Sequence, residues 1–158
     1  MKLELYRNVC GRCGEDFLSY ALPSHAYGPT LFATGRDEVA VSFPDRDPVW
    51  SEVSALVDAT TAAVGLTESE KAEVFEDAFA HTVDPAPSGV TFSPWGKIPC
   101  PRCAAIQRSY FGPSDPPRFV ELQPADVTHK RWSRLPSAAK QRVIDTAIQD
   151  WVRRTSSR

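Results

Sequence analysis

Apolar and polar residues alternate over the first ten positions of the chain. Leu3, Leu5 and Val9 stand at alternating positions among polar neighbours, which predicts a half-buried strand. Short apolar runs at 39–43 and 90–92, bounded by Pro44 and Pro94, predict two more strands. A further run at 119–122 predicts a fourth strand. These four segments together indicate a sheet.

Between and after these strands the apolar spacing becomes helical. One face of a helix is predicted by Val49, Val53, Leu56, Val57 and Val64, and Gly65 ends it. Thr67 and Glu70 form a Thr-x-x-Glu capping box for a second helix, with an apolar stripe of Phe75, Ala78 and Phe79. A last helix, beginning near Ser137, would bury Ile144, Ala147, Ile148 and Trp151.

Four cysteines stand in two matched pairs, Cys10 with Cys13 and Cys100 with Cys103. Two residues between the cysteines of a pair let both sulfurs reach one ion from a single tight turn. The first turn continues with Gly14, whereas Ala104 occupies the equivalent position of the second. Arg12 and Arg102, one inside each turn, are expected to offset the charge of four thiolates. We therefore expect one structural zinc ion, bound by all four cysteines.

The pairs are far apart, with 86 residues between Cys13 and Cys100. Closing a loop several times longer than a compact site needs costs only about 1.4 kcal/mol more. Zinc binding by thiolate-rich sites contributes about 10–16 kcal/mol, so the separation is tolerated. The alternatives are a redox pair at Cys10 and Cys13, two disulfides, or iron in place of zinc. A redox pair would leave the second matched pair unexplained.

The two CxxC turns resemble those of the zinc ribbons, the rubredoxin-like proteins in which two such turns clasp a metal between short strands. The resemblance covers the turns and their immediate flanks. Together with the helices that the apolar spacing predicts, it gives an α+β fold: a zinc ribbon of short antiparallel strands, an inserted helical hairpin at about 45–84 and a C-terminal helix packed across the ribbon. We expect one domain over residues 1–158. Because all four ligands are cysteines, no position is left for an activated water, and the zinc is expected to be structural.

Charge is divided unevenly along a chain whose net charge is only −2. From 45 to 84, ten acidic residues stand against Arg46 and Lys71. The second predicted helix carries a dense acidic set, expected to bind a basic protein partner: Glu68, Glu70, Glu73, Glu76 and Asp77. Such a surface suits an inhibitor or immunity-type protein, and the same acids could instead serve only solubility.

The C-terminal third favours a different partner. From 100 to 158, eleven basic residues stand against five acidic ones, with aromatic residues among them. Phosphate neutralisation with base stacking needs such residues on one surface. Nucleic-acid binding, in transcription- or RNA-related work, is thus the alternative function, with the candidates Arg102, Arg108, Lys130, Arg131, Trp132 and Arg134. The overall pI of about 5.9 counts against it.

Other candidates for chemistry have simpler interpretations. Asp45 and Asp47 could hold a cation, but their place before a helix favours capping. His129 beside Trp132 could grip a phosphate, although a buried Trp132 is the favoured interpretation. His25 and His81 are isolated. No phosphate-binding glycine loop or other catalytic motif occurs, so we expect a binding protein and no enzyme, with no small-molecule substrate.

The N-terminus is charged from Lys2 and lacks the apolar block of a signal peptide. No apolar run approaches the roughly 18 residues that a membrane span needs. These two features predict a cytoplasmic protein that does not bind membranes, where thiols stay reduced and can bind metal.

Overall fold

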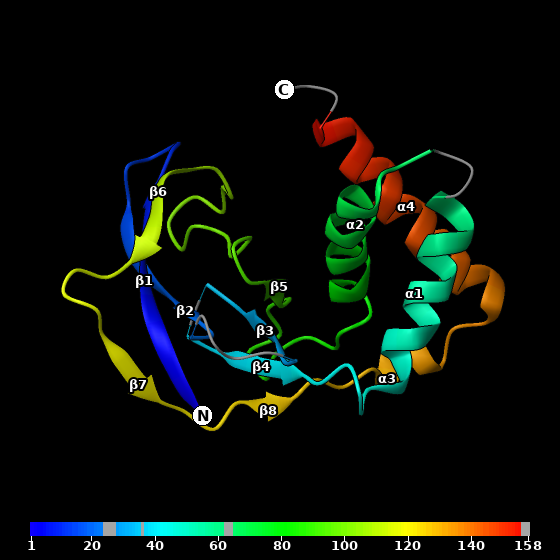
Figure 1. Ribbon diagram of the computed structural model, residues 1–158, viewed down its shortest axis with the longest axis horizontal. Helices are drawn as coiled ribbons and strands as arrows, with labels where there is room; N and C mark the ends of the chain where they lie inside the picture. The colour runs from blue at the N-terminus through cyan, green and yellow to red at the C-terminus, as the bar shows by residue number, and fades with distance from the viewer. Residues whose placement is uncertain (24–27, 36, 62–64, 156–158) are drawn as a thin grey trace. The chain divides into compact units, whose positions relative to one another are not determined.

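The computed structural model has an α+β fold, with eight strands in two sheets and four helices among the residues it describes, 1–23, 28–35, 37–61 and 65–155 (Figure 1). His25 and Val64, which entered the sequence predictions, lie outside these residues. The chain forms two compact units. We call Met1–Phe43 with Pro85–Val127 the sheet unit, and Pro44–Asp84 with Thr128–Arg158 the helical unit. The assignment of the whole chain to one domain stays a prediction.

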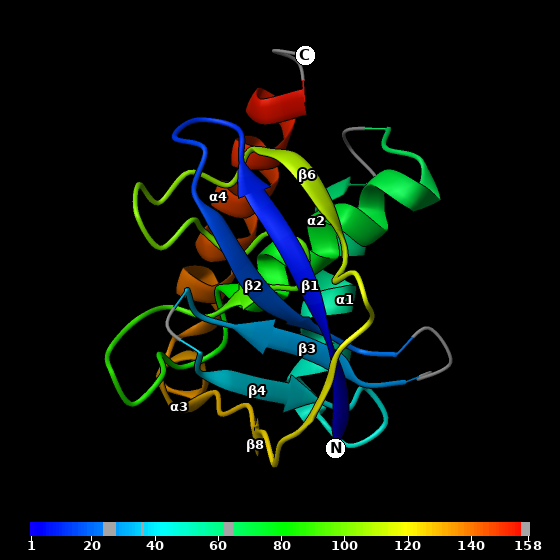
Figure 2. The same ribbon diagram turned by 90° about the vertical axis from the view of Figure 1, so that its left-hand side faces the viewer.

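The first sheet of the sheet unit is built around β1 (Lys2–Cys10), the longest strand. β2 (Asp16–Ala21) pairs with one side of β1. β6 (Arg108–Pro113) and β7 (Phe119–Glu121) pair with the other side, and all three pairings are antiparallel. Figure 2 shows β2, β1 and β6 side by side. The predicted strands at the N-terminus and at 119–122 are thereby confirmed.

The second sheet has the order β5-β3-β4-β8. It consists of β3 (Thr30–Ala33), β4 (Val39–Ser42), β5 (Ser93–Pro94) and β8 (Ala125–Asp126). The strand predicted at 90–92 is wrong, because pairing begins only at Ser93. The carbonyl of Val90 instead accepts the N–H of Ala86 in a turn, and of this run only Phe92 is buried.

The helical unit packs α1 (Pro48–Thr61), α2 (Glu68–Ala80) and α4 (Ser137–Thr155) against one another, with the short α3 (Lys130–Ser133) beside them. α4 buries the four residues predicted for it. It does so against α1 and α2 rather than across the ribbon, because those two helices present the apolar faces that it needs. None of the helices in the described residues is long and apolar enough to cross a membrane.

The N-terminus of α2 has the predicted capping box. Thr67 accepts the N–H of Glu70 on its hydroxyl, and the Glu70 carboxylate accepts the N–H of Thr67. The apolar stripe differs from the prediction in one member, since Val74 is fully buried and Phe75 only half-buried. Phe75 packs against the side chain of Trp50, with the two ring centroids 4.5 Å apart.

Candidate metal centre

Two turns of the sheet unit have the same backbone pattern. In the first, the N–H of Gly14 binds the carbonyl of Cys10 at 3.0 Å. In the second, the N–H of Ala104 binds the carbonyl of Cys100 at 2.9 Å. Each leading cysteine also donates its own N–H five residues onward, to Glu15 and Ala105. The two CxxC sequences therefore fold into equivalent turns despite the differences between them.

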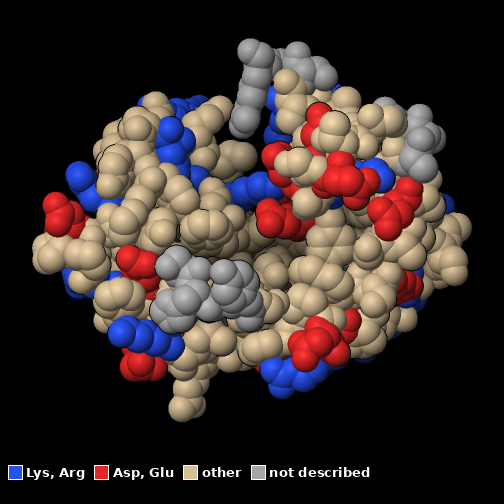
Figure 3. Space-filling view, in the orientation of Figure 1, with Lys and Arg blue, Asp and Glu red and all other residues tan. Residues whose placement is uncertain are grey.

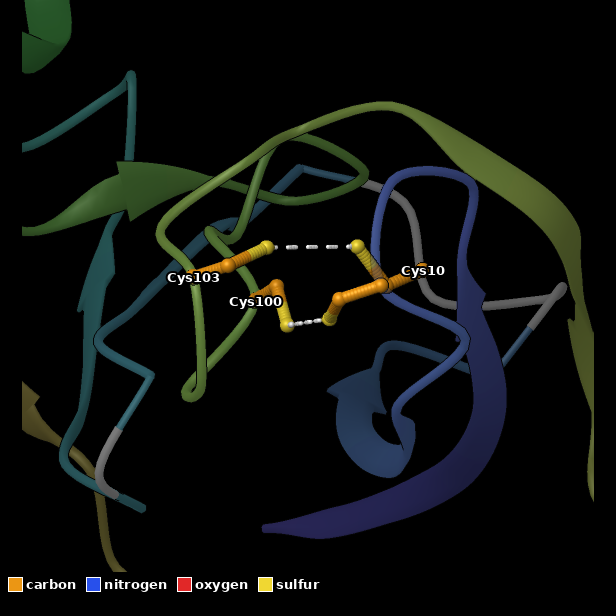
Figure 4. A group of neighbouring side chains, drawn as sticks. Cys10, Cys100 and Cys103 are labelled. Carbon is orange, nitrogen blue, oxygen red and sulfur yellow. Dashed lines mark hydrogen bonds between the residues drawn. The ribbon is translucent and has the colours of Figure 1, made fainter.

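The turns bring their four sulfurs together (Figure 4). Cys10 Sγ lies 3.6 Å from Cys103 Sγ, and Cys13 Sγ lies 3.7 Å from Cys100 Sγ. All four sulfurs are within 4.8 Å of one another, and all four cysteines are free. Four thiolates placed tetrahedrally about 2.3 Å from an ion have sulfurs about 3.8 Å apart. The group can therefore hold a metal ion, and its four cysteines leave no place for a water ligand.

One residue of each turn has a left-handed backbone. Gly14 has φ of 73° and Ala104 has φ of 58°. Glycine adopts this conformation without steric penalty, whereas a Cβ next to the carbonyl costs about 1–2 kcal/mol. Alanine at the second turn therefore carries strain that the rest of the turn, with its hydrogen bonds and sulfur ligands, must offset.

The sulfurs differ in exposure and in acidity. Cys10 and Cys100 are buried, and Cys13 and Cys103 are half-buried. The backbone N–H groups of Cys13 and Arg12 lower the pKa of Cys10 to about 6. For Cys13 the N–H of Glu15 acts in the same direction, but burial and hydrogen bonds to the neighbouring thiols prevail and raise the pKa to about 12. Cys10 is thus far more acidic than Cys13 and is a thiolate at neutral pH.

A half-buried guanidinium lies beside the sulfurs. Arg108, at the start of β6, donates to the carbonyls of Gly96, Ile98 and Ile106 and to the side chain of Asn8. Burial lowers its pKa, and the negative charges of Cys10 and Cys100 oppose that shift. Sequence reasoning placed Arg108 on a nucleic-acid surface. The structure instead uses it to tie the second turn to β1 and to neutralise thiolate charge.

The two arginines inside the turns are both exposed. Arg102 reaches the carboxylate of Glu15, just past the first turn, at 3.5 Å. Its charge therefore links the two turns from outside. Arg12 contributes through its backbone, whose N–H lies 3.4 Å from Cys10 Sγ. The expected charge compensation thus comes mainly from Arg108, for which the spacing offered no signal.

The remaining nucleic-acid candidates do not form one surface within a unit. Arg102 and Arg108 belong to the sheet unit, and the other four belong to the helical unit. Lys130, Arg131 and Arg134 are exposed around α3. Trp132 is 2% exposed and donates its Nε1–H to Glu52 at 2.7 Å. Its ring is therefore part of the core, as the favoured interpretation had it, and cannot stack on a base in this arrangement.

The acidic candidates on α2 fall into two kinds. Glu70 belongs to the capping box, and Asp77 is half-buried and binds Arg154. Glu73 accepts the indole N–H of Trp151 at 3.3 Å while staying exposed. Glu68 and Glu76 are exposed, and Glu68 pairs with Lys71 one turn along the helix. Part of the acidic set therefore stabilises the helical unit, and part faces solvent.

A buried histidine–carboxylate pair escaped sequence reasoning. His129 Nε2 lies 3.0 Å from Asp47 Oδ2, and His129 Nδ1 lies 3.0 Å from the hydroxyl of Thr82. This is the order of groups in a hydroxyl–histidine–carboxylate triad, but the Thr82 side chain is buried and donates to the carbonyl of Phe79. No substrate can reach it, so the group stabilises the unit. Its members are 47 and 82 residues apart in sequence and carried no motif.

Asp47 caps a helix, as its place before α1 predicts. Asp47 Oδ1 accepts the N–H of Val49 in the first turn of α1. Asp84 accepts the N–H groups of Lys130 and Arg131 and so caps α3 from a distant segment. His81 is exposed at the end of α2. None of these residues joins the cysteines in a metal-binding group among the described residues.

Comparison of the chain with family models, with curated proteins and with solved structures finds no match. The site is therefore interpreted from its own geometry.

Metal affinity should fall as pH falls, because protons compete with the ion for the thiolates. The lowered pKa of Cys10 keeps it a thiolate above about pH 6, so it releases no proton on binding there. Below that pH it must lose one. A plot of log affinity against pH should therefore steepen by about one proton near pH 6, measured by competition with a chromophoric chelator. A slope that stays constant through this range would contradict the assignment of Cys10 as the first thiolate.

Gly14→Ala should destabilise the metal-bound protein by about 1 kcal/mol, through the left-handed backbone alone, since an added Cβ meets nothing within 4 Å. Gly11→Ala is the matched control, with ordinary contacts and no positive φ. Ala104→Gly, the reverse change at the equivalent position, should stabilise the protein by a similar amount, because it relieves the same left-handed strain. Denaturant unfolding measures all three. Equal losses for Gly14→Ala and Gly11→Ala would refute the strain argument.

Proposed function

We propose that the four cysteines bind one structural zinc ion and that the two turns with their flanking strands are a zinc ribbon. The donor set supports this, because four thiolates complete a tetrahedral shell and suit zinc in closed, non-catalytic sites. Iron accepts the same ligands, but an electron carrier needs no long insertion between its turns. When bound, the ion supplies a tetrahedral cross-link, and the chain's own residues supply the neutralising charge and the turn geometry.

The ion would link the end of β1 to the loop that precedes β6, next to the point where these two strands pair. Cys10 ends β1, and Cys100 lies in a loop without regular structure. The contacts of Arg108 and Arg102 connect the same two segments, so charge and metal would act on one junction. A structural site of this kind contributes about 10–16 kcal/mol to folding, more than the whole net stability of many domains.

The zinc proposal is tested by Cys100→Ser. The wild-type protein should contain one zinc per chain by elemental analysis, and the variant none, with the cooperative unfolding of the sheet unit lost. Ser109→Ala, a change on β6 that touches no sulfur, is the control and should keep its zinc. Iron in the wild-type protein, or a Cys100→Ser protein that stays fully folded without metal, would contradict the proposal.

We further propose that the protein is a non-catalytic binding module whose partner is a basic protein that docks on α2. The observation that carries this is the exposed acidic face of α2, where Glu68, Glu73 and Glu76 face solvent. Acidic side chains gather over the part of the helical unit where α2 lies (Figure 3). Such a field accelerates encounter with a positively charged partner and disfavours acidic ones.

The helix that carries this surface is held rigidly. Its N-terminus is capped by Thr67, and its flank is fixed to α4 by the contacts of Glu73 with Trp151 and of Asp77 with Arg154. A preorganised charged surface binds with less loss of conformational entropy than a flexible one. An inhibitor of a nucleic-acid-cleaving protein, as in toxin–immunity pairs, would need these properties: an acidic surface, a fixed shape, and activity in a reducing cytoplasm without catalysis.

Charge reversal at Glu68→Lys with Glu76→Lys should abolish capture of the partner. These positions are chosen because Glu70 and Asp77 stabilise the helical unit. Asp115→Lys with Asp126→Lys, both exposed in the sheet unit, changes the net charge equally and is the control. Tagged protein is used for pull-down from its native cells, with and without nuclease. Wild type and control should retain a stoichiometric basic protein after nuclease, and the α2 variant should lose it at least tenfold.

Two results would contradict this proposal. Equal capture by the α2 variant would show that the acidic surface is not the interface. A bound fraction that disappears with nuclease, and binds more tightly to the α2 variant, would favour nucleic-acid binding through the exposed basic residues instead.

A further inference from the structure

β2 is an edge strand with one side unpaired. It pairs with β1, and among the described residues no backbone hydrogen bond joins its other side to a strand. An unpaired edge presents a row of N–H and C=O groups that readily accepts a further strand. In this respect β2 differs from β1, whose two sides are both occupied.

The register shows which β2 residues present these groups. Leu5 uses its N–H and its carbonyl on the β6–β7 side of β1, with Arg118 and Ser114. Because successive residues of a strand point their backbone groups to opposite sides, Tyr6 and Asn8 point theirs at β2. Their partners Ser19 and Phe17 point back. The outward groups of β2 therefore belong to the alternate residues Asp16, Leu18 and Tyr20.

A cavity of about 480 Å³ runs along this edge. Five consecutive residues of β2, 16–20, line one side, and Gly35, Ile98 and Pro101 line the other. The far wall is close-packed, since a Cβ on Gly35 would lie 3.1 Å from the carbonyl oxygen of Pro99. Pro101 lies between two of the metal-binding cysteines, so the metal centre holds this wall in place.

The edge lacks most of the devices that usually block strand pairing, and its one charged outward residue, Asp16, is paired with Arg7 at the start of the strand. β2 contains no proline, no lysine and no bulge, and the outward residue Leu18 is 43% exposed. Polar groups stand farther along the cavity, where Tyr20 donates its hydroxyl to the carboxylate of Asp37. Burial and the charge of Asp37 raise the pKa of Tyr20, which keeps the phenol protonated as the donor.

We propose that this groove binds an extended segment of another protein, which adds to β2 as an antiparallel or parallel strand and places a basic side chain against Asp37. The recessed position of the edge determines which kind of partner can bind there. The cavity beside the edge, about 480 Å³, leaves room for a single extended chain, whereas a second copy of this protein would bring its own wall into the same space. The groove lies in the sheet unit and does not involve the acidic surface of α2.

The test starts with a phage-displayed library of random octapeptides, selected on the metal-loaded protein and then synthesised. Selected peptides should alternate apolar and polar residues and contain lysine or arginine. Leu18→Pro removes an outward N–H and none that β1 uses, so it should weaken binding at least tenfold. Leu18→Ala, which keeps the N–H, should weaken it about threefold. Retained metal shows that both variants are folded.

N-methylation of amides along a selected peptide gives the most specific test for strand pairing. Methyl groups at every second amide should abolish binding, and those between should be tolerated, as pairing with one strand edge requires. Asp37→Asn should remove the preference for a basic residue, since asparagine tolerates the left-handed φ of 63° at this position. Glu68→Lys with Glu76→Lys should bind the peptides like wild type, so this inference and the α2 interface can fail separately.

Three results would overturn the inference. They are the selection of no binding octapeptide, equal binding by wild type and Leu18→Pro, and a wild-type dimer in sedimentation that Leu18→Pro dissociates. The last would assign the edge to a second copy of the chain.

Discussion

The sheet unit depends on the junction between two short turns that come from distant parts of the chain. Cys10 and Cys13 follow the longest strand, and Cys100 and Cys103 interrupt a loop with little regular structure of its own. Their sulfurs meet within 4.8 Å, which brings β1, β2 and the segment leading into β6 to one point. In a unit whose second sheet contains strands of only two residues, such a cross-link replaces the extended pairing that other folds use.

Placing four sulfurs together creates an electrostatic problem that the structure solves with one half-buried cation. Four thiolates on a divalent ion would leave a net charge near −2, and the guanidinium of Arg108 lies beside the sulfurs with its donors directed at carbonyls on either side of the second turn. A buried charge without partners would be strongly destabilising, so these hydrogen bonds are what make its position possible. The same side chain reaches Asn8 on β1, and charge compensation and the positioning of the turn are thus one interaction.

The two units present different surfaces. The helical unit uses its buried polar contacts, such as His129 with Asp47 and Trp132 with Glu52, to fix helices that carry acidic residues outward. In the sheet unit, the turn that carries Cys100 and Cys103 forms part of one wall beside an unpaired strand edge. Both surfaces are held by a rigid framework, which is the condition under which charge or backbone pairing produces specific binding.

The sequence alone determined those features that depend on neighbours along the chain. The CxxC turns, the capping box of Thr67 and Glu70 and the buried face of α4 follow from local spacing, and each is present. The strand predicted at 90–92 is wrong because the carbonyl of Val90 closes a turn with Ala86 and only Phe92 is buried. Only the tertiary structure decided that α4 packs with α1 and α2, that Arg108 serves the sulfurs, and that His129 meets Asp47. These contacts join residues tens of positions apart. Their partners are chosen by complementary burial and hydrogen bonding, and no periodicity in the sequence encodes that choice.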